Sequence, residues 1–170
     1  ISRISSGKLS MNLLRFDLCE LVGDLVDRSS EQLKAAGCQI KIEASQSAVG
    51  TWDRFRIEQV VMNLLTNAMR YGAGKPILLQ VKTSKIDAQI IVCDQGRGIA
   101  KENHERIFQR FERAISENEV SGLGLGLYIT KQILEAHRGS ICVESELGKG
   151  AIFCAKLPLF EEKEKVKHGS

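Results

Sequence analysis

Hydrophobic residues recur along this chain with two periods, one typical of helices and one typical of strands. Apolar residues three and four positions apart predict helices over residues 18–36, 54–71 and 125–137. Asp53 stands where the N-cap of the second helix belongs, and Gly37 follows the first helix where a C-terminal stop is expected. The helical part of the fold can therefore be placed from spacing alone.

Alternation with period two predicts strands in the segments between these helices. Ile40 and Ile42 alternate with polar neighbours, residues 77–83 and 89–94 form a hairpin around a turn-like SKIDA, and residues 140–145 and 151–157 form a second hairpin. The order of elements predicts an α+β fold, a two-layer α/β sandwich with a mixed sheet of about five main strands covered on one face by three helices.

The regular pattern lapses between residues 95 and 126. This stretch contains glycines, a short helix-like segment NHERIFQRF and the polar run ISENEVSG. Connections of this length in a compact domain are unusual, and they are commonly functional. We therefore expect this stretch to act as a lid over a site.

Composition narrows the class of protein. The chain has 170 residues, 43% hydrophobic and 26% charged, with a formal net charge of +3 and both signs interspersed, which excludes a disordered or collagen-like chain and does not favour nucleic acid as a partner. A long apolar run and a signal peptide are both missing, so we expect a cytoplasmic domain without direct membrane contact, although the full-length protein could be anchored.

Cysteine usage points to reduced thiols. The five cysteines are odd in number, widely spaced and form no CxxC pair. Cys93, Cys142 and Cys154 fall within apolar, strand-like runs. We expect buried free thiols in a reducing compartment rather than disulfides or metal ligands.

Two common nucleotide-binding motifs are missing from the sequence. The glycines at 122, 124 and 126 do not complete GxGxxG because position 127 is Leu127, and the GK pairs lack the surrounding residues of a P-loop. On the second helix, Asn63, Asn67 and Arg70 share a strip about 60° wide. Such a strip can hold Mg²⁺ and phosphate, or it can simply be a solvated polar face.

Two glycine-containing segments suggest a nucleotide site more directly. The DQGRGI segment places Asp94 at the end of a strand, where its carboxylate can accept from an exocyclic amine while the adjacent glycines let a flat ring approach. The SGLGLGL segment precedes an amphipathic helix, whose first N–H groups favour an anion. An ordinary turn and a flexible linker are the alternatives.

Taken in order, five segments resemble those of one family. QVVMNLLTNAMRY, DQGRGI, IFQRF, GLGLGLYITKQI and ELGKGAIF are similar to the N, G1, F, G2 and G3 boxes in the ATP-binding catalytic domain of bacterial sensor histidine kinases, within the gyrase, Hsp90, histidine kinase and MutL superfamily. The resemblance covers about residues 11–159. It implies the Bergerat-type ATP-binding fold, with ATP and Mg²⁺ bound.

The resemblance also implies residue roles. Asn67 would hold Mg²⁺, with Asn63 near the metal and phosphates; Arg70 would contact phosphate, and Arg113 would reach the γ-phosphate from the lid. Asp94 would accept from the adenine amino group. The other positions implied at ATP are Tyr71, Gly96, Gly98, Ile99, Phe108, Arg110, Gly122, Leu123, Gly124, Leu125 and Gly126. Phe108 and Phe111 could equally be core anchors of the lid.

Two positions depart from the family pattern. Asn63 stands where superfamily members that hydrolyse ATP have a glutamate, and an amide cannot serve as a general base, so hydrolysis is not expected to be the main activity. Ala151 follows Gly150 where the family usually has Thr or Ser. Any support that such a hydroxyl gives to the adenine site is therefore absent at this position.

The expected function is transfer of the γ-phosphoryl group of Mg-ATP to a histidine on a separate dimerisation domain of the full-length protein, with a response regulator downstream. Two alternatives stay open, a nucleotide-binding regulatory module without transfer activity and a serine kinase of the anti-sigma-factor kind. We expect residues 1–10 to be the remnant of a dimerisation helix or linker, residues 11–160 the catalytic domain, and residues 161–170 a charged, disordered tail.

Overall fold

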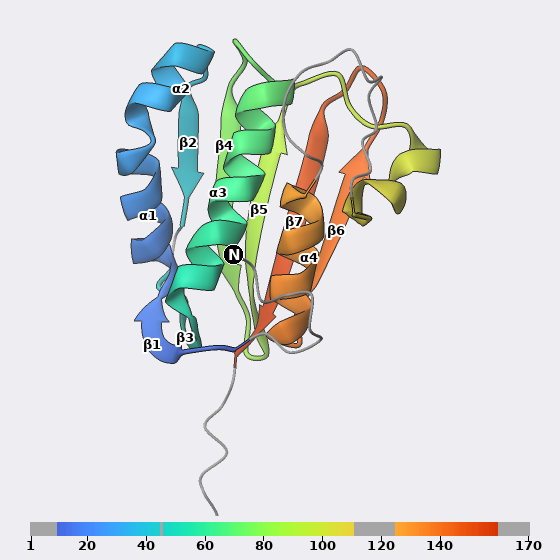
Figure 1. Ribbon diagram of the computed structural model, residues 1–170. Helices are drawn as coiled ribbons and strands as arrows, with labels where there is room; N and C mark the ends of the chain where they lie inside the picture. Colours follow the sequence, from blue (N-terminus) through green and yellow to red (C-terminus); the bar gives the residue numbers. More distant parts are fainter. Residues whose placement is uncertain (1–9, 45, 111–124, 160–170) are drawn as a thin grey trace, which may run out of the picture.

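The segments with helical spacing and the segments with strand alternation form two separate layers in the computed structural model. The structure describes residues 10–44, 46–110 and 125–159. One layer is a five-stranded mixed sheet (Figure 1). In spatial order its strands are β2 (Ile40–Glu43), β4 (Ile77–Thr83), β5 (Asp87–Asp94), β7 (Ala151–Pro158) and β6 (Ser140–Ser145). Only β2 and β4 pair in parallel, and the other neighbours are antiparallel. The expected mixed sheet and both expected hairpins are confirmed.

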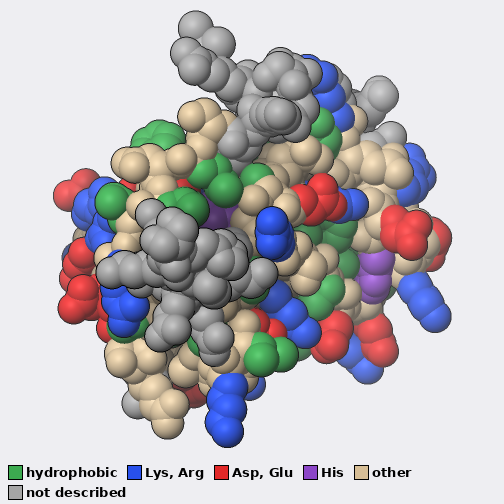
Figure 2. All heavy atoms as spheres, turned by 90° about the horizontal axis from the view of Figure 1, so that it is seen from below, with side chains coloured by type: hydrophobic (Ala, Val, Ile, Leu, Met, Phe, Trp, Pro, Cys, Tyr) green, Lys and Arg blue, Asp and Glu red, His purple; other side chains and the backbone are tan. Residues whose placement is uncertain are grey.

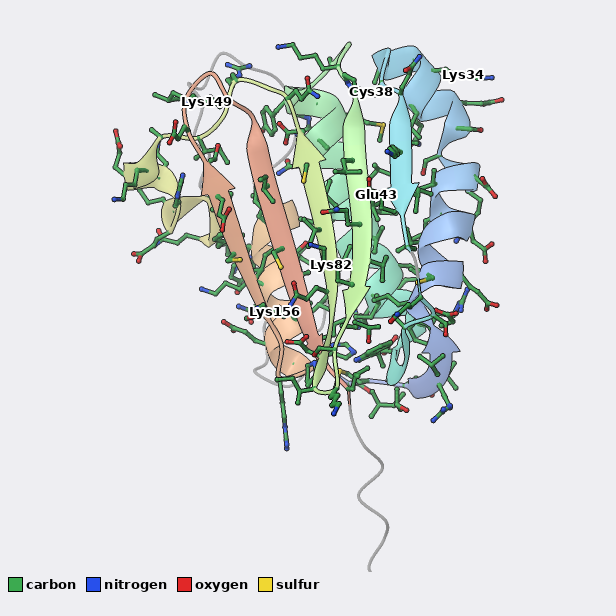
Figure 3. All side chains as sticks on the ribbon, turned by 180° about the vertical axis from the view of Figure 1, so that it is seen from behind. Lys34, Cys38, Glu43, Lys82, Lys149 and Lys156 are labelled. Carbon is green, nitrogen blue, oxygen red and sulfur yellow. The ribbon has the colours of Figure 1, made fainter. Side chains whose placement is uncertain are left out.

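The helices form the second layer and cover one face of this sheet (Figure 1). They are α1 (Leu18–Arg28), α2 (Ser30–Ala36), α3 (Arg54–Tyr71) and α4 (Gly126–Ala136). The apolar stripe of α3, including Ile57, Val61 and Leu64, is fully buried against the inward-facing side chains of the strands. Seen from behind, the opposite face of the sheet is covered by none of the α-helices in the described residues (Figure 3). The α+β sandwich predicted from the sequence is confirmed.

The first helix differs from the prediction because it breaks at Ser29. The Ser29 hydroxyl donates a 2.8 Å hydrogen bond to the carbonyl of Leu25, and its backbone N–H also bonds the carbonyls of Leu25 and Val26. This residue caps α1 and precedes α2, so the continuous helix over residues 18–36 is two helices. A buried serine whose hydroxyl bonds back to the preceding turn can end a helix at a position that the apolar spacing does not reveal.

A second, two-stranded sheet was not predicted. It pairs β1 (Leu13–Asp17) with β3 (Val49–Asp53) in antiparallel fashion. Its anchor is Trp52, which is fully buried and whose indole N–H donates a 3.0 Å bond to the carbonyl of Pro158 at the end of β7. Neither strand has a strong alternation of its own, and contacts far apart in sequence hold the pair in place.

The N-cap expected at Asp53 is present and belongs to a larger network. Asp53 Oδ1 accepts a 3.1 Å bond from the backbone N–H of Arg56, while the Asp53 N–H donates to His137 Nε2 at 3.0 Å. His137 is fully buried, and its Nδ1 donates to the carbonyl of Ile133 at 2.8 Å. Because Nε2 accepts a hydrogen bond, the imidazole is neutral. This contact ties the end of α4 to the start of α3.

The described part of the helix-like segment expected over residues 103–111 contains one short 3₁₀ turn, η3 (Arg106–Phe108), and a second turn, η2 (Lys101–Asn103), precedes it. Acidic and basic side chains are interspersed on the face shown in Figure 2, as the charge pattern predicted.

Across the part of the chain that the structure describes, no helix has the length and apolar character needed to cross a membrane.

The expectation for the strand cysteines needs correction. Cys142 is exposed, and Cys93 and Cys154 are half-buried. All three occupy alternate strand positions that face away from the helices, while the intervening positions such as Val92 and Phe153 fill the core. A strand-like apolar run identifies a strand, but it does not say which of its two faces is covered.

Candidate functional site

The centre of the site is the Asp94 carboxylate at the end of β5. Asp94 is 9% exposed, and its Oδ1 accepts hydrogen bonds from the backbone N–H of Gly96 at 2.9 Å and from that of Ala151 at 3.3 Å. Burial raises the pKa of this carboxyl above its ordinary value, and the two N–H groups act in the opposite direction. The carboxylate is thus held by backbone donors from the loop after β5 and from the start of β7.

Glycines surround this carboxylate because side chains would not fit. A Cβ at Gly96 would lie 2.2 Å from the carbonyl oxygen of Tyr71, and one at Gly150 would lie 2.1 Å from the carbonyl oxygen of Asp94. A Cβ at Gly72 would meet the Ala68 carbonyl oxygen at 2.9 Å. The end of α3, the end of β5 and the start of β7 therefore approach one another with backbone alone between them.

Ser145 joins the two loops that flank Asp94. Its hydroxyl donates a 2.6 Å hydrogen bond to the carbonyl of Gly150 and accepts a 2.7 Å bond from the backbone N–H of Ile99. Sequence reasoning missed this residue, because a serine at the end of a strand carries no local signal. Ser145 of β6 stands opposite Ala151 of β7 in the sheet, next to the position where the G3 segment has no hydroxyl.

The same two loops meet at Gly98. This residue has φ of +74°, and a Cβ there would lie 1.9 Å from the carbonyl oxygen of Glu146. The neighbouring Arg97 carbonyl accepts a 2.6 Å bond from the N–H of Gly148. The DQGRGI segment and the turn between β6 and β7 are therefore packed into one wall, which the sequence had placed in two separate motifs.

The polar strip on α3 reaches the start of α4. The Asn63 side-chain amide donates to the Gly126 carbonyl at 3.1 Å and to the Thr130 hydroxyl at 3.2 Å. Asn67, one turn further along α3, is half-buried, and Arg70 is exposed. Asn63 thus positions the first turn of α4, while Asn67 and Arg70 follow it on the same side of α3.

The start of α4 offers backbone N–H donors without a side-chain cap at Leu125. Its N-cap position is Leu125, whose side chain has no hydrogen-bond acceptor, so it cannot satisfy the N–H groups of the first turn. Leu125 is half-buried and Gly126 is exposed. These donors and the positive end of the helix dipole suit a phosphate oxygen.

The described part of the expected lid, up to residue 110, is anchored in the core through Phe108. Phe108 is 8% exposed, and its ring meets that of Phe153 edge to face, with centroids 6.3 Å apart. Ile99 is half-buried against the same core, and its carbonyl is bonded to His104 Nε2 at 3.0 Å. Of the two roles expected for Phe108, the structure shows the one as a core anchor. Arg110 is exposed.

Several predicted residues lie outside the described part of the chain. These are Phe111, Arg113, Gly122, Leu123 and Gly124. The site as described therefore consists of the ends of α3 and β5, the loop up to Ile99, the β6–β7 turn and the first turn of α4. Tyr71, which borders Gly96 through its carbonyl, completes the group that the structure brings together.

The residues present fit a magnesium ion that is shared with a ligand rather than one held by protein alone. Within the described residues, no group of three or more His, Cys, Asp or Glu side chains is placed to hold a metal. Asn67 offers one amide oxygen on the polar side of α3. Mg²⁺ is commonly bound by one or two protein oxygens together with phosphates and water, which matches this donor set.

Comparison with known proteins identifies the family. Residues 52–161 match the family described as histidine kinase-, DNA gyrase B- and HSP90-like ATPases. The sensor protein SrrB of Staphylococcus aureus is 34% identical over 161 residues, which cover 93% of this chain and 28% of SrrB. The chain thus spans little more than a quarter of the length of this relative.

Solved structures share the fold. The nucleotide-free catalytic domain of the histidine kinase ThkA superposes with a TM-score of 0.78 at 26% identity, covering 88% of this chain and 99% of that domain. Full-length ShkA in complex with AMPPNP has a TM-score of 0.82 at 26% identity, covering 92% of this chain and 33% of ShkA. The histidine kinase AdeS of Acinetobacter baumannii has a TM-score of 0.77 at 25% identity, covering 93% of this chain and 73% of AdeS.

Proposed function

This chain belongs to the histidine kinase-, DNA gyrase B- and HSP90-like ATPases and has the fold of a histidine kinase catalytic domain, and we propose that it is the ATP-binding catalytic domain of a two-component sensor kinase. It would bind Mg-ATP and transfer the γ-phosphoryl group to a histidine on a dimerisation domain of the same full-length protein. A response regulator would then receive the group.

The observation that carries this proposal is the buried Asp94 carboxylate. Its Oδ1 is occupied by the N–H groups of Gly96 and Ala151, which leaves Oδ2 to accept from a ligand. Gly72, Gly96 and Gly150 let the backbones of α3, β5 and β7 pack closely around this carboxylate. Adenine has an exocyclic amine that donates, whereas guanine has a carbonyl at the corresponding position that a carboxylate repels. The site therefore favours ATP over GTP.

The phosphate end of the ligand would lie toward α3 and α4. Asn67 would hold the magnesium ion, which neutralises phosphate charge when bound. The first turn of α4, aligned by Asn63, would donate N–H groups to phosphate oxygens, and Arg70 would add a positive charge. Arg113 is proposed to reach the γ-phosphate. This arrangement supplies positioning and charge neutralisation, and Asn63 supplies no base for hydrolysis.

Nucleotide selectivity tests the adenine assignment. Calorimetric titration should give tighter binding of ATP than of GTP by the wild type. Asp94→Asn should weaken ATP binding by about 10- to 100-fold, because a hydrogen bond to a charged group contributes about 1.5–3 kcal/mol. Asp87→Asn, at the other end of β5, is the control and should bind like the wild type. Equal affinity for ATP and GTP in the wild type would refute the assignment.

Transfer is tested with a supplied acceptor. The chain is mixed with radiolabelled ATP, Mg²⁺ and a dimerisation domain that carries the acceptor histidine. Label that is lost in acid and kept in alkali identifies phosphohistidine. Acid-stable label would indicate a serine kinase, and nucleotide binding without any label on several acceptor domains would indicate a regulatory module.

The metal role of Asn67 is tested in the same assay. Asn67→Ala should reduce transfer and the dependence of ATP binding on Mg²⁺, because the variant lacks the amide oxygen proposed as a ligand. Thr66→Ala, at the adjacent exposed position of α3, is the matched control. Unchanged transfer by Asn67→Ala in excess Mg²⁺ would show that the metal is held elsewhere.

A further inference from the structure

The register of the final hairpin places Cys142 of β6 directly opposite Cys154 of β7. We propose that these two thiols form a modification site, in which a low-molecular-weight disulfide oxidises them to a reversible cross-strand disulfide. This site lies on the uncovered face of the sheet and does not depend on the proposed nucleotide chemistry.

Strand geometry brings the two cysteines within bonding range. Residues directly opposite each other in antiparallel strands have Cα atoms about 4.5 or 5.5 Å apart, according to the type of pair. Disulfides span Cα separations of about 4.4–6.8 Å. Either type of pair is therefore within the Cα range of a Cys142–Cys154 bond, and the two Cβ atoms, about 4.5–5.5 Å apart in such pairs, approach to about 3.5–4.5 Å when the bond forms. Both side chains also point to the same face, because directly opposite residues share a side of the sheet.

That face is open to solvent on the side of β6. The helices cover the opposite face, while Glu43, Lys82 and Lys156 mark the uncovered one (Figure 3). Cys142 is exposed, so a small oxidant can reach it, and Cys154 is half-buried beside it. The neighbouring position on β7, Lys156, is exposed on the same face. A dissolved disulfide therefore has access to this pair.

The two thiols have different environments. Burial is the main reason that the pKa of Cys154 rises to about 11, and the adjacent Cys142 thiol adds to the rise. The Cys154 thiol donates to Gln89 Oε1 at 3.6 Å. Cys142 is consequently the thiol that meets the oxidant first, and Cys154 is the resolving thiol.

The reaction is two thiol–disulfide exchanges. The Cys142 thiolate attacks one sulfur of RSSR, which forms a mixed disulfide and releases RS⁻. The Cys154 sulfur, as it loses its proton, attacks the Cys142 sulfur, which forms the protein disulfide and releases a second RS⁻. The two protons of the protein thiols end on the two released RS⁻ groups. The protein is oxidised by two electrons, and RSSR is reduced to two RSH.

Competing pairs are less well placed. Cys93 lies on the same face, but its partner across β5 and β7 is Ile152, while Cys154 lies opposite Ile91. Cys93 and Cys154 are thus diagonal neighbours, whose Cα atoms are about 7–8 Å apart, beyond the range of an unstrained disulfide. Cys19 is on α1, and Cys38 donates to the carbonyl of Gly72 at the end of α3. The register therefore singles out one pair among the five cysteines.

The cross-link would act on strands that reach the nucleotide site. Ser145 ends β6 three residues after Cys142, and Ala151 begins β7 three residues before Cys154. A covalent link between the two strands fixes the register that places these residues beside Asp94. Closing this short loop also restricts the unfolded chain, so the oxidised protein should unfold at a higher Tm.

Peptide mapping after oxidation tests the site. The full chain is incubated with oxidised glutathione, free thiols are alkylated, and the denatured protein is digested with trypsin without reduction. Free thiols should fall from five to three. Residues 139–149 and 150–156 should appear as one linked peptide, lighter by two hydrogens than the two peptides together, and dithiothreitol should separate them.

Variants distinguish this bond from its competitors. Cys142→Ser and Cys154→Ser should each lose the linked peptide, and Cys154→Ser should accumulate one glutathione adduct on Cys142. Cys93→Ser should keep the linked peptide and serves as the matched control, since Cys93 lies on the same sheet face. The proposal is overturned if the wild type yields only glutathione adducts, a Cys93–Cys154 link or a disulfide between two chains.

Discussion

The Ser145 hydroxyl and the Gly150 carbonyl are joined by a 2.6 Å hydrogen bond, which closes the turn beside Asp94. The same hydroxyl accepts from the N–H of Ile99, so it holds the loop after β5 against the loop before β7. The two segments that flank the proposed adenine site are thus held together by one side chain.

Ser145→Ala should therefore destabilise the domain by about 1–3 kcal/mol, because it leaves the Ile99 N–H and the Gly150 carbonyl without their partner. Urea unfolding measures the change, and ATP titration should show weaker binding. Ser140→Ala, at the exposed start of the same strand, is the control. Equal unfolding free energies for the two variants would show that the Ser145 bonds contribute nothing to stability.

Two glycines of one turn should differ sharply in their tolerance of alanine. Gly148 and Gly150 both have positive φ, but a Cβ at Gly148 meets nothing within 4 Å, while one at Gly150 would lie 2.1 Å from the Asp94 carbonyl oxygen. Gly148→Ala should cost about 1–2 kcal/mol for its backbone conformation. Gly150→Ala should cost a further 1–3 kcal/mol for the forced displacement and should weaken ATP binding. Equal unfolding free energies for the two variants would contradict the close approach at Gly150.

Asp94→Asn should change the pH dependence of stability. Burial raises the pKa of the folded-state carboxyl, so the folded protein binds a proton more tightly than the unfolded chain does. The Asp94 contribution to stability therefore falls as the pH rises from about 3.9, the unfolded value, through the higher folded pKa. The variant lacks this loss, so its unfolding free energy relative to the wild type should be higher at pH 7 than at pH 4. An unchanged difference, measured by urea unfolding, would contradict the raised pKa.

His137 should make the domain sensitive to acid. Burial lowers its pKa, and the Asp53 N–H bond to Nε2 requires a neutral ring, although the Ile133 carbonyl and the Asp53 charge act in the opposite direction. Stability from this group is complete above about pH 6.5, the unfolded value, and is lost as the pH falls toward the lower folded pKa, at up to about 1.4 kcal/mol per pH unit.

The variant His137→Gln tests this assignment, since the side-chain carbonyl can accept from the Asp53 N–H and does not titrate. It should unfold with a smaller loss of stability between pH 7 and pH 5 than the wild type. His104→Gln, at a half-buried histidine between η2 and η3, is the control and should keep the wild-type dependence. A wild-type pH profile for His137→Gln would assign the acid sensitivity to another group.

Parts of the fold and site could be predicted because the information is local. The apolar spacing on α3 and the Asp53 cap predict that helix at its observed bounds, and they place Asn63, Asn67 and Arg70 on one strip. The motif DQGRGI likewise predicts a strand-terminal Asp94. In each case the residues that matter are close in sequence, and the period of the backbone decides which way they face.

Other parts could not be predicted because they depend on partners far along the chain. The strands β1 and β3 are held by Trp52, whose hydrogen bond reaches Pro158. The break at Ser29 is a hydroxyl bonding back to Leu25, which competes with the continuing helix that apolar spacing favours. The Ser145 bonds to Ile99 and Gly150 join motifs that appear separate in the sequence.

The sequence by itself determined the strands of the five-stranded sheet, the helix α3, the order of the five motifs and the identity of the residues proposed to meet ATP, since these follow from periodicity, glycine placement and resemblance. Only the tertiary structure decided which face of each strand is covered and which residues stand opposite one another. For this reason Cys142, which the sequence predicts to be buried, is exposed and stands opposite Cys154. The physical reason is that strand register and layer packing are set by long-range contacts, which no local pattern contains.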